Sequence, residues 1–343
     1  MTDRTTSPRR FADAAEAGRE VERWSAGAQV LALFTTLYRQ GWTRYLATPR
    51  DFATISEFSG LPPARLRDVL EVLETHGIVK QDGSMVRLSE PFEALAAEDA
   101  WIGMDDVLDR AELATRLALE AVRGWSTVPL APSDALIMAR AAGGQTTTVT
   151  KAMFAKLMAD LPEWPAAMRN GRWLDVGCGV GATTLTLAAM YPQMRAVAIE
   201  VFPAIATEAK RRAKELGVSE RVDVRNMDAR DFAELGAFEG AFWAQPFFPP
   251  SSRAGTLAVI RRALRPGGLL IMQELDPEPQ TYKLSDDERR SSALRRLLYR
   301  GWHMPFGLTA ERLEAEAEAA GFAAVRVATT EFGRFVLVRR PAD

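Results

Sequence analysis

Hydrophobic positions in roughly the first 140 residues recur every three or four residues, and this spacing predicts a mainly helical region. The clearest helical segments lie at about residues 12–24, 25–40 and 101–123. Beyond residue 150 the pattern changes to short apolar runs separated by amphipathic stretches, in the order strand, helix, strand. That alternation is typical of a parallel sheet with helices on both of its faces.

The second half of the chain yields five strands and three helices in alternation. The predicted strands are 172–176, 195–200, 221–226, 239–244 and 269–274, and the predicted helices are 181–190, 203–216 and 252–264. A further helix at 309–320 precedes two β-rich runs, AAVRVATTEF and RFVLVRR. Residues 124–150 are rich in Gly, Pro, Ser and Thr, as connectors are. We therefore predict an α/β protein with one domain at 1–145 and a second at 146–343.

Residues 51–90 contain a helix, a turn, a second helix and a hairpin around Asp82-Gly83, which together predict a winged-helix unit. A wing that binds DNA usually presents basic side chains to the phosphates. This segment carries only four basic side chains against seven acidic ones. Its charge favours a contact with protein over nucleic acid. The alternative function is a transcriptional regulator that uses the wing on DNA and the second domain as a ligand sensor.

Composition narrows the class further. The 343 residues carry a net charge of −2, so no global field draws the chain to nucleic acid or to an anionic membrane. No apolar stretch approaches the roughly 18 residues that a membrane helix needs, and the first 20 residues, which lack the apolar core of a secretory signal, predict a short frayed terminus. A single cysteine, Cys178, fits a reducing cytoplasm. With only two histidines, a Cys/His metal site is not expected, and we predict no metal.

The segment RWLDVGCGVGATTLTLAAM carries the most specific chemistry. A buried-looking strand ends at Asp175, and Gly177, Gly179 and Gly181 follow at alternate positions before a helix begins. Glycines let the backbone turn sharply and approach a ligand without a Cβ in the way. Free N–H groups at the start of the helix can hold an anionic group, although glycines also serve tight packing of strand on helix.

Later strands end in residues that suit a nucleoside. Glu200 ends the second strand, where a carboxylate can hold a ribose diol. After the third strand, Asp228 can accept a hydrogen bond from an adenine amino group, and Met227 can cover the ring. The segment LRPGGLLIMQE then adds a Pro-Gly-Gly turn before a fifth strand. Each feature alone also fits a solvated or core residue, but their order points to a nucleoside cofactor.

In these motifs the chain resembles the class I S-adenosylmethionine-dependent methyltransferases. Together with the helical, winged-helix first half, it is similar to the small-molecule O-methyltransferases of plants and bacteria. The resemblance implies a Rossmann-like catalytic domain with a mostly parallel seven-stranded sheet, and a first domain that builds a homodimer. It implies that S-adenosylmethionine binds and leaves as S-adenosylhomocysteine. The implied cofactor residues are Asp175, Gly177, Gly179, Gly181, Glu200, Val201, Met227, Asp228, Ala229 and Trp243.

A nicotinamide dehydrogenase is the rival interpretation of this glycine loop. Its fingerprint is G-x-G-x-x-G, whereas Gly181 stands one place too early for the third glycine. An acid at Asp175, directly before the loop, also suits a methionine ammonium better than a pyrophosphate. We therefore expect a methyltransferase.

The acceptor site departs from the family pattern. A histidine base follows the fourth strand in the resembling O-methyltransferases, but here the stretch reads GAFWAQPFFPPSSRAG, with Gln245 and Pro246 in its place. Gln-Pro-Phe-Phe loosely resembles the tetrapeptide of amino-group methyltransferases, whose amide accepts a hydrogen bond from the attacking nitrogen. Gln245 and His303 are the catalytic candidates, and the missing base favours N-methylation over O-methylation. The same loop also fits a rigid hydrophobic wall.

The acceptor itself is only outlined. Aromatic residues expected at the pocket suit a small aromatic or heterocyclic compound, although each also fits an ordinary core; they are Trp243, Phe247, Phe248, Trp302 and Phe306. The excess of Arg over Lys is associated with GC-rich bacterial genomes and hence with secondary metabolism. Apolar periodicity from Trp24 to Leu37 motivates the homodimer, unless these residues pack within their own chain.

Overall fold

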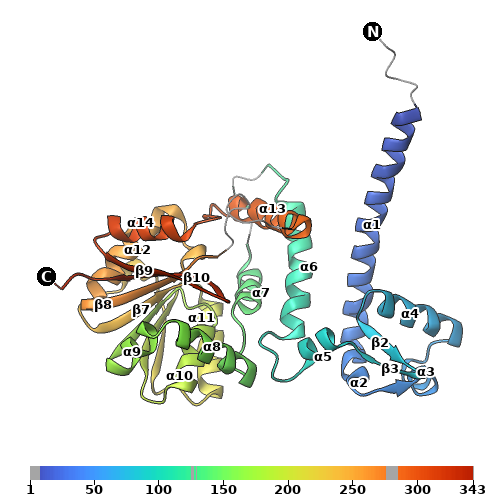
Figure 1. Ribbon diagram of the computed structural model, residues 1–343, viewed down its shortest axis with the longest axis horizontal. Coiled ribbons are helices and arrows are strands. Elements are labelled where there is room, and N and C mark those ends of the chain that lie inside the picture. Colours follow the sequence, from blue (N-terminus) through green and yellow to red (C-terminus); the bar gives the residue numbers. More distant parts are fainter. Residues whose placement is uncertain (1–7, 125–126, 129, 276–284, 343) are drawn as a thin grey trace, which may run out of the picture. The chain divides into compact units, whose positions relative to one another are not determined.

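A computed structural model of the chain describes residues 8–124, 127–128, 130–275 and 285–342. Contacts divide the chain into two compact units, Met1–Glu98 and Asp99–Asp343, which we describe one at a time (Figure 1). The predicted division between a dimerisation domain and a catalytic domain at 145/146 stays a prediction. The contact-based division falls earlier, so the helices between residues 104 and 142 belong to the unit of the large sheet.

The first unit combines five helices with a small antiparallel sheet. Its elements are α1 (Pro8–Arg39), α2 (Trp42–Leu46), β1 (Arg50–Asp51), α3 (Phe52–Ser59), α4 (Pro63–Thr75), β2 (Val79–Asp82), β3 (Met85–Leu88) and α5 (Glu90–Ala96). The strands lie in the order β1-β3-β2. Helices α3 and α4 and the hairpin β2–β3 occupy the segments where the sequence predicts helix, turn, helix and hairpin.

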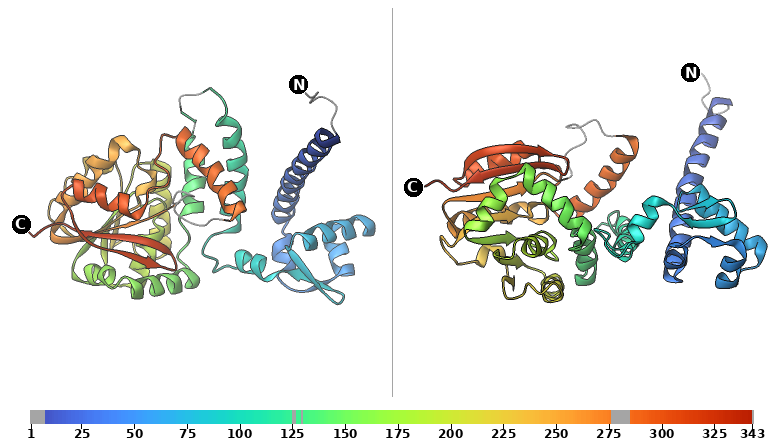
Figure 2. Two further views of the ribbon diagram at one scale, coloured as in Figure 1. Left: turned by 45° about the horizontal axis from the view of Figure 1, so that its top comes forward. Right: turned by 60° about the horizontal axis from the view of Figure 1, so that its bottom comes forward.

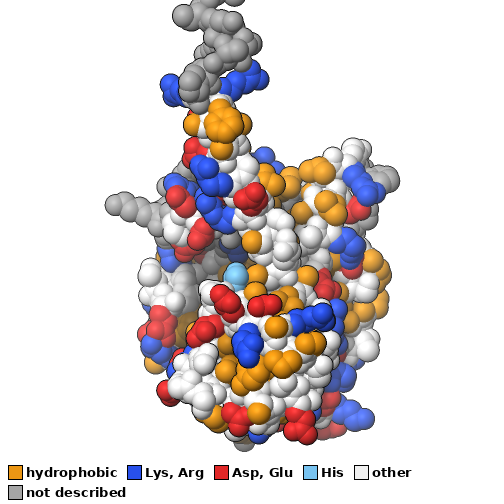
Figure 3. Space-filling model, turned by 90° about the vertical axis from the view of Figure 1, so that its right-hand side faces the viewer, with side chains coloured by type: hydrophobic (Ala, Val, Ile, Leu, Met, Phe, Trp, Pro, Cys, Tyr) orange, Lys and Arg blue, Asp and Glu red, His pale blue; other side chains and the backbone are white. Residues whose placement is uncertain are grey.

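Helix α1 is one continuous helix of 32 residues where the sequence predicts two segments and a short frayed terminus. No proline interrupts the helix after Pro8. It ends at Arg39, and Gly41, with a left-handed φ of 86°, separates it from α2. Phe34 and Leu37 near its end are buried, whereas Trp24 is exposed. Hydrophobic side chains stand between charged ones along the helix that leads to the N-terminus (Figure 3). The first seven residues lie outside the described part of the chain.

The second unit is built on a seven-stranded sheet in the order β6-β5-β4-β7-β8-β10-β9. Strands β4 to β8 are parallel to one another, and β10 joins antiparallel to β8 and β9. This confirms the predicted α/β fold with a mostly parallel sheet. The strands are β4 (Arg172–Val176), β5 (Arg195–Glu200), β6 (Val222–Asn226), β7 (Phe238–Trp243), β8 (Leu264–Gln273), β9 (Ala323–Thr330) and β10 (Gly333–Arg339).

Helices cover both faces of this sheet, as Figures 1 and 2 show. They are α8 (Thr148–Asp160), α9 (Glu163–Asn170), α10 (Ala182–Met190), α11 (Pro203–Glu215), α12 (Pro250–Ala263) and α14 (Ala310–Ala319). The unit also contains α6 (Met104–Glu120), α7 (Pro132–Ala142) and α13 (Asp286–Gly301), which pack on one another and, through α7, on α11. Short 3₁₀ turns stand at η1 (Ala229–Asp231) and η2 (Gln245–Phe247). No helix in the described ranges is long and apolar enough to cross a membrane.

Alternation along the central strands creates two separate cores. In β5, Ala196 and Ala198 pack toward the face covered by α8 to α11, and Val197 and Ile199 pack toward the face covered by α12 and α14. This period of two is the geometry of a strand that is buried on both faces. Because β4, β5 and β6 are parallel neighbours, their carboxyl ends meet at one edge of the sheet, where ligands bind in such folds.

Candidate functional site

The glycine loop joins the end of β4 to the start of α10. Gly177, Gly179 and Gly181 all have positive φ, at 75°, 56° and 81°. A Cβ on Gly177 would lie 2.6 Å from Cε2 of Phe248, so only glycine fits there. A Cβ on Gly179 would meet no atom within 4 Å, so this part of the loop borders open space. The loop is therefore packed on one side and open to a ligand on the other.

Asp175 lies buried beneath the loop, with 1% of its surface exposed. Its Oδ2 accepts a hydrogen bond of 2.6 Å from Oγ1 of Thr184, while its Oδ1 is buried with no hydrogen-bond partner among the described residues. Burial raises the pKa of Asp175 to about 7, and the nearby Glu200 adds repulsion. A buried carboxylate with an unused oxygen fits a cationic group, because unpaired buried acceptors are costly.

Glu200 ends β5 beside the loop, and both of its carboxylate oxygens are held by backbone. Gly179 N–H donates to Oε2 at 3.0 Å, and Phe202 N–H donates to Oε1 at 2.9 Å. Burial raises the pKa of this carboxyl above its ordinary value. Val201, the next residue, is 52% exposed. The second acid is thus held at the open side of the glycine loop, as the sequence predicts.

The end of β6 brings the third predicted element to the same edge. Met227 N–H donates to the carbonyl of Glu200 at 3.0 Å, which ties the two strand ends together, and Ala229 is buried. Asp228 accepts from the backbone N–H of Arg230 and forms an ion pair of 2.7 Å with its guanidinium. Arg230 therefore lowers the pKa of Asp228. Sequence reasoning missed Arg230, although a basic residue two places after the acid was a visible signal.

Trp243 at the end of β7 is a core residue. Its side chain has no exposed surface, because Phe248 packs edge-to-face on it at 5.4 Å and the guanidinium of Arg253 lies 4.7 Å from its ring. Its indole N–H is buried with no hydrogen-bond partner among the described residues, and the prediction that Trp243 contacts the cofactor or the acceptor stays a prediction.

Gln245 is 1% exposed, and its amide is oriented by the strand next to it. Its Nε2 donates to the carbonyl of Gln273 at 3.1 Å, so the carbonyl oxygen points elsewhere. That oxygen, Oε1, is buried and has no hydrogen-bond partner in the described part of the chain. The residue lines a small cavity together with Pro246, Leu275, Tyr299, Pro305, Phe306, Gly307 and Leu308. The cavity wall is apolar apart from one amide and one phenol.

His303, the second catalytic candidate, is exposed and does not line this cavity. It follows α13 with a φ of 55°, a left-handed conformation that histidine adopts more readily than most residues. Its Nε2 lies 3.1 Å from Oγ1 of Thr127, within hydrogen-bond distance. Phe306 and Tyr299, three or four residues away, do line the cavity, and Tyr299 was not among the predicted pocket residues.

Two charged residues near Gln245 had no sequence signal. Arg253 on α12 is buried and donates to the backbone carbonyl of Gln245 at 2.8 Å. Glu274, directly after β8, is buried, and its Oε1 accepts from Ala310 N–H at 3.0 Å. No group of three or more His, Cys, Asp or Glu side chains arranged for a metal ion occurs among the residues that the structure describes.

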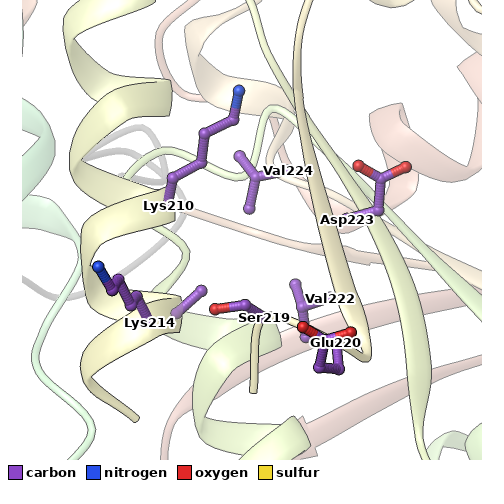
Figure 4. A pocket seen from close by; sticks show the side chains of 8 residues that line it. Lys210, Lys214, Ser219, Glu220, Val222, Asp223 and Val224 are labelled. Atoms are coloured by element: carbon purple, nitrogen blue, oxygen red, sulfur yellow. The ribbon is translucent and has the colours of Figure 1, made fainter. Parts of the chain in front are cut away.

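A larger hollow of about 530 Å³ lies elsewhere, between the end of α11 and the start of β6 (Figure 4). Its lining carries charges of both signs, from the lysines Lys210 and Lys214 and the carboxylates Glu220 and Asp223. It involves the amino end of β6, whereas the glycine loop and the paired acids lie at the carboxyl ends of the strands. The hollow is separate from the candidate site.

Part of the chain is similar in sequence to known proteins. Residues 174–268 match the family described as a methyltransferase domain. Over 108 residues the chain is 33% identical to the uncharacterized protein YjhP of Escherichia coli strain K12, covering 30% of this chain and 41% of that protein. Over 104 residues it is 31% identical to the carboxy-S-adenosyl-L-methionine synthase of Chromohalobacter salexigens, covering 29% and 38%. The matches span about two fifths of these curated relatives.

Solved structures resemble almost the whole chain. An O-methyltransferase family protein from Burkholderia thailandensis has a TM-score of 0.70 at 14% identity, covering 94% of this chain and 98% of that one. Human N-acetylserotonin methyltransferase in complex with S-adenosylmethionine has a TM-score of 0.65 at 14% identity, covering 99% and 100%. The N,N-8-amino-8-demethyl-D-riboflavin dimethyltransferase of Streptomyces davawensis has 0.60 at 17%, covering 94% and 98%. At these identities the likeness shows a shared fold.

The glycine loop, the acids at the strand ends and the sheet order define the S-adenosylmethionine-dependent methyltransferase class, as the sequence predicts. The chain carries a methyltransferase domain of this class, on a fold that it shares with O-methyltransferases.

Proposed function

We propose that this protein transfers the methyl group of S-adenosylmethionine to a small, neutral aromatic or heterocyclic acceptor. The proposed acceptor atom is a nitrogen, and an oxygen is the alternative. The observation that carries the proposal is the amide of Gln245, which lies in the wall of a cavity of about 10 Å³ that has to widen when an acceptor binds. The cavity wall is apolar, and the Oε1 of Gln245 is a buried acceptor without a hydrogen-bond partner among the described residues. An N–H or O–H donor on the bound molecule satisfies that oxygen.

The residues at the carboxyl ends of the strands suit the cofactor. In our proposal the free Oδ1 of Asp175 accepts a hydrogen bond from the methionine ammonium, and Glu200 holds the ribose hydroxyls. The open side of the loop at Gly179 leaves room for the part of the cofactor that links the ammonium to the ribose. Asp228 accepts from the adenine amino group while Met227, Val201 and Ala229 line the ring. The bound cofactor supplies an electrophilic methyl group on a sulfonium.

The protein's contribution to the reaction is mainly orientation and exclusion of water. Holding two reactants in line is worth about 7–11 kcal/mol in well-oriented cases. A neutral amine presents a lone pair near neutral pH and needs no base before it attacks, whereas a hydroxyl gains about 10²–10⁴-fold from one. The segment from Ala241 to Gly268 contains no His, Asp or Glu, and this favours nitrogen. In the competing mechanism, His303 accepts the proton of a hydroxyl acceptor.

The further roles belong to the same proposal. We propose that the first part of the chain, predicted as 1–145 with a winged-helix unit, forms a homodimer, because α1 exposes Phe11, Val21 and Trp24. We also propose a cytoplasmic enzyme of bacterial secondary metabolism, supported by the single cysteine and the arginine-rich composition. The acidic balance of residues 51–90 supports a protein contact over a DNA contact.

Calorimetric titration followed by a transfer assay tests this function. The protein is titrated with S-adenosylmethionine, S-adenosylhomocysteine and NAD, and it is expected to bind the first two only. Radiolabelled methyl transfer is then measured on a panel of neutral aromatic amines, N-heterocycles and phenols. Transfer to amines ahead of phenols supports the proposal. Transfer to phenols alone contradicts the preference for nitrogen, and no transfer to any aromatic compound contradicts the acceptor class.

A further inference from the structure

The guanidinium of Arg253 connects three separate elements beneath the candidate acceptor site. From α12 it donates to the backbone carbonyl of Gln245 at 2.8 Å and forms two hydrogen bonds, of 3.0 and 2.6 Å, with Oε2 of Glu316 on α14. It also lies 4.7 Å from the ring of Trp243 at the end of β7. With 5% of its surface exposed, it is one of the few buried charged side chains among the described residues.

An ion pair with one buried partner is a weak source of stability, because taking the guanidinium out of water offsets much of its attraction to Glu316, whose side chain is 30% exposed. Apolar residues of similar volume fill such a space equally well. Arginine differs from them in its geometry: a rigid planar fork can hold a carboxylate, a carbonyl and an aromatic face at once. The arrangement therefore points to fixed placement of the groups that Arg253 contacts.

Two of these contacts, Trp243 and Gln245, belong to the segment between Arg253 and the glycine loop. Phe248 packs on Trp243, and its ring fills the space directly beside Gly177. Ala244 N–H donates to the carbonyl of Val176 at 3.0 Å, next to the start of the loop. Residues 243–248 are thus held by Arg253 on one side and by the glycine loop on the other.

We propose that Arg253 is a positioning residue: it fixes residues 243–248 so that the Gln245 amide keeps a constant place relative to the cofactor loop. This inference rests on the proposed function for the value of that placement, but the placement itself can be measured without any ligand. Glu316 orients the guanidinium by accepting hydrogen bonds from Nε and Nη2, while Nη1 donates to the backbone carbonyl of Gln245.

The first experiment compares Arg253→Lys with Arg326→Lys in the full-length chain by hydrogen exchange. Arg326 is a matched control on β9, because it also binds a carboxylate with two nitrogens, that of Glu163, and a backbone carbonyl, that of Asp160. A lysine keeps the charge in both cases and loses the fork. We expect the hydrogen-bonded amides of Ala244 and Phe248 to exchange about tenfold faster or more in Arg253→Lys and to keep the wild-type rate in Arg326→Lys. Equal exchange in wild type and Arg253→Lys overturns the proposal.

The second experiment measures single-turnover methyl transfer to the best acceptor from the aromatic panel. A misplaced reacting group can cost about 100-fold, so Arg253→Lys is expected to lower the rate by about 10- to 100-fold. The dissociation constant for S-adenosylhomocysteine should change by less than about threefold, because Trp243 apart none of the predicted cofactor residues contacts the guanidinium. An equal loss of rate in Arg326→Lys overturns the proposal. A wild-type chain that binds no S-adenosylmethionine contradicts the proposed function instead.

A double-mutant cycle distinguishes an effect of Arg253 through the position of Gln245 from a general loss of stability. If Arg253 acts on the rate through the amide, the substitution Arg253→Lys costs about threefold or less once Gln245→Ala has removed that amide. Full additivity of the two losses overturns the proposal. Should Arg253→Lys fail to fold, Glu316→Gln replaces it in all three measurements. It keeps the bond to Gln245 and is expected to give a smaller change in the same direction, and no change in exchange overturns the proposal.

Discussion

Asp175 and Thr184 are joined by a hydrogen bond of 2.6 Å between the threonine hydroxyl and Oδ2 of the carboxylate. The other oxygen, Oδ1, is buried and unpartnered within the described residues. The bond fixes the orientation of the carboxylate, so that the free oxygen keeps one position beneath the glycine loop. A preorganised acceptor of this kind binds a cation without first reorienting.

Asp175→Asn is expected to weaken the binding of S-adenosylmethionine by about 10- to 100-fold, because it removes the charge from a hydrogen bond worth about 1.5–3 kcal/mol. Calorimetric titration measures the dissociation constant. Asp160→Asn, at the end of α8, is the control, because that residue is exposed. A dissociation constant equal to that of the wild type would remove Asp175 from the cofactor site.

Cofactor affinity is expected to rise with pH up to about 7 and to level off above it. Burial raises the pKa of Asp175 to about 7, so below that pH the carboxyl is mostly protonated and must lose its proton when the ammonium binds. One released proton corresponds to about a tenfold change in affinity per pH unit. Glu200, whose pKa burial also raises, acts with the same sign. Asp175→Asn should therefore flatten the dependence, and an unchanged slope in that variant contradicts the assignment.

His303→Asn is expected to leave the single-turnover rate within about threefold of the wild type, whereas loss of a general base costs about 10²–10⁴-fold. Asparagine suits the left-handed conformation of residue 303, so the comparison avoids the strain that alanine introduces there. Gln245→Ala, measured in parallel, should lower the rate more than tenfold. If His303→Asn loses about 100-fold while acceptor affinity holds, the base-free mechanism is wrong and His303 accepts the proton.

Gly177→Ala is expected to destabilise the protein more than Gly217→Ala. Both glycines have positive φ, of 75° and 66°, which costs an L-residue about 1–2 kcal/mol. Only at Gly177 does the new methyl group meet a neighbour, the ring of Phe248, and such crowding costs about 1–3 kcal/mol more. Urea unfolding measures both free energies. Equal losses would show that the Phe248 ring moves aside freely.

Trp24→Glu is expected to reduce a dimeric mass to a monomeric one at micromolar concentration, as measured by light scattering. Trp24 and Val21 lie one turn apart on α1 and are both exposed, so a buried dimer contact there would not accept a carboxylate. Met85→Glu, on β3 of the same unit, controls for an added charge. A wild-type chain that is monomeric under these conditions refutes the dimer directly.

The sequence by itself determined the features that depend on local patterns. Strand and helix order, the glycine loop and the acids at Asp175 and Glu200 follow from periodicity and from residues that stand next to strand ends. Parallel strands bring their carboxyl ends to one edge whatever the details of packing. Helix α1 shows the limit of local patterns, since two predicted segments form one helix.

Only the tertiary structure decided which side chains face the site. Trp243 and Gln245 are two residues apart in the chain, yet the first is enclosed by Phe248 and Arg253 while the second lines the small cavity beside Tyr299. Arg253 and Glu316 are 63 positions apart, so no local pattern indicates that they meet. Such contacts depend on how helices pack across a finished sheet, and packing is set by the shapes of all the neighbours at once. The sequence therefore located the glycine loop, while the folded chain decided which residues surround the amide of Gln245.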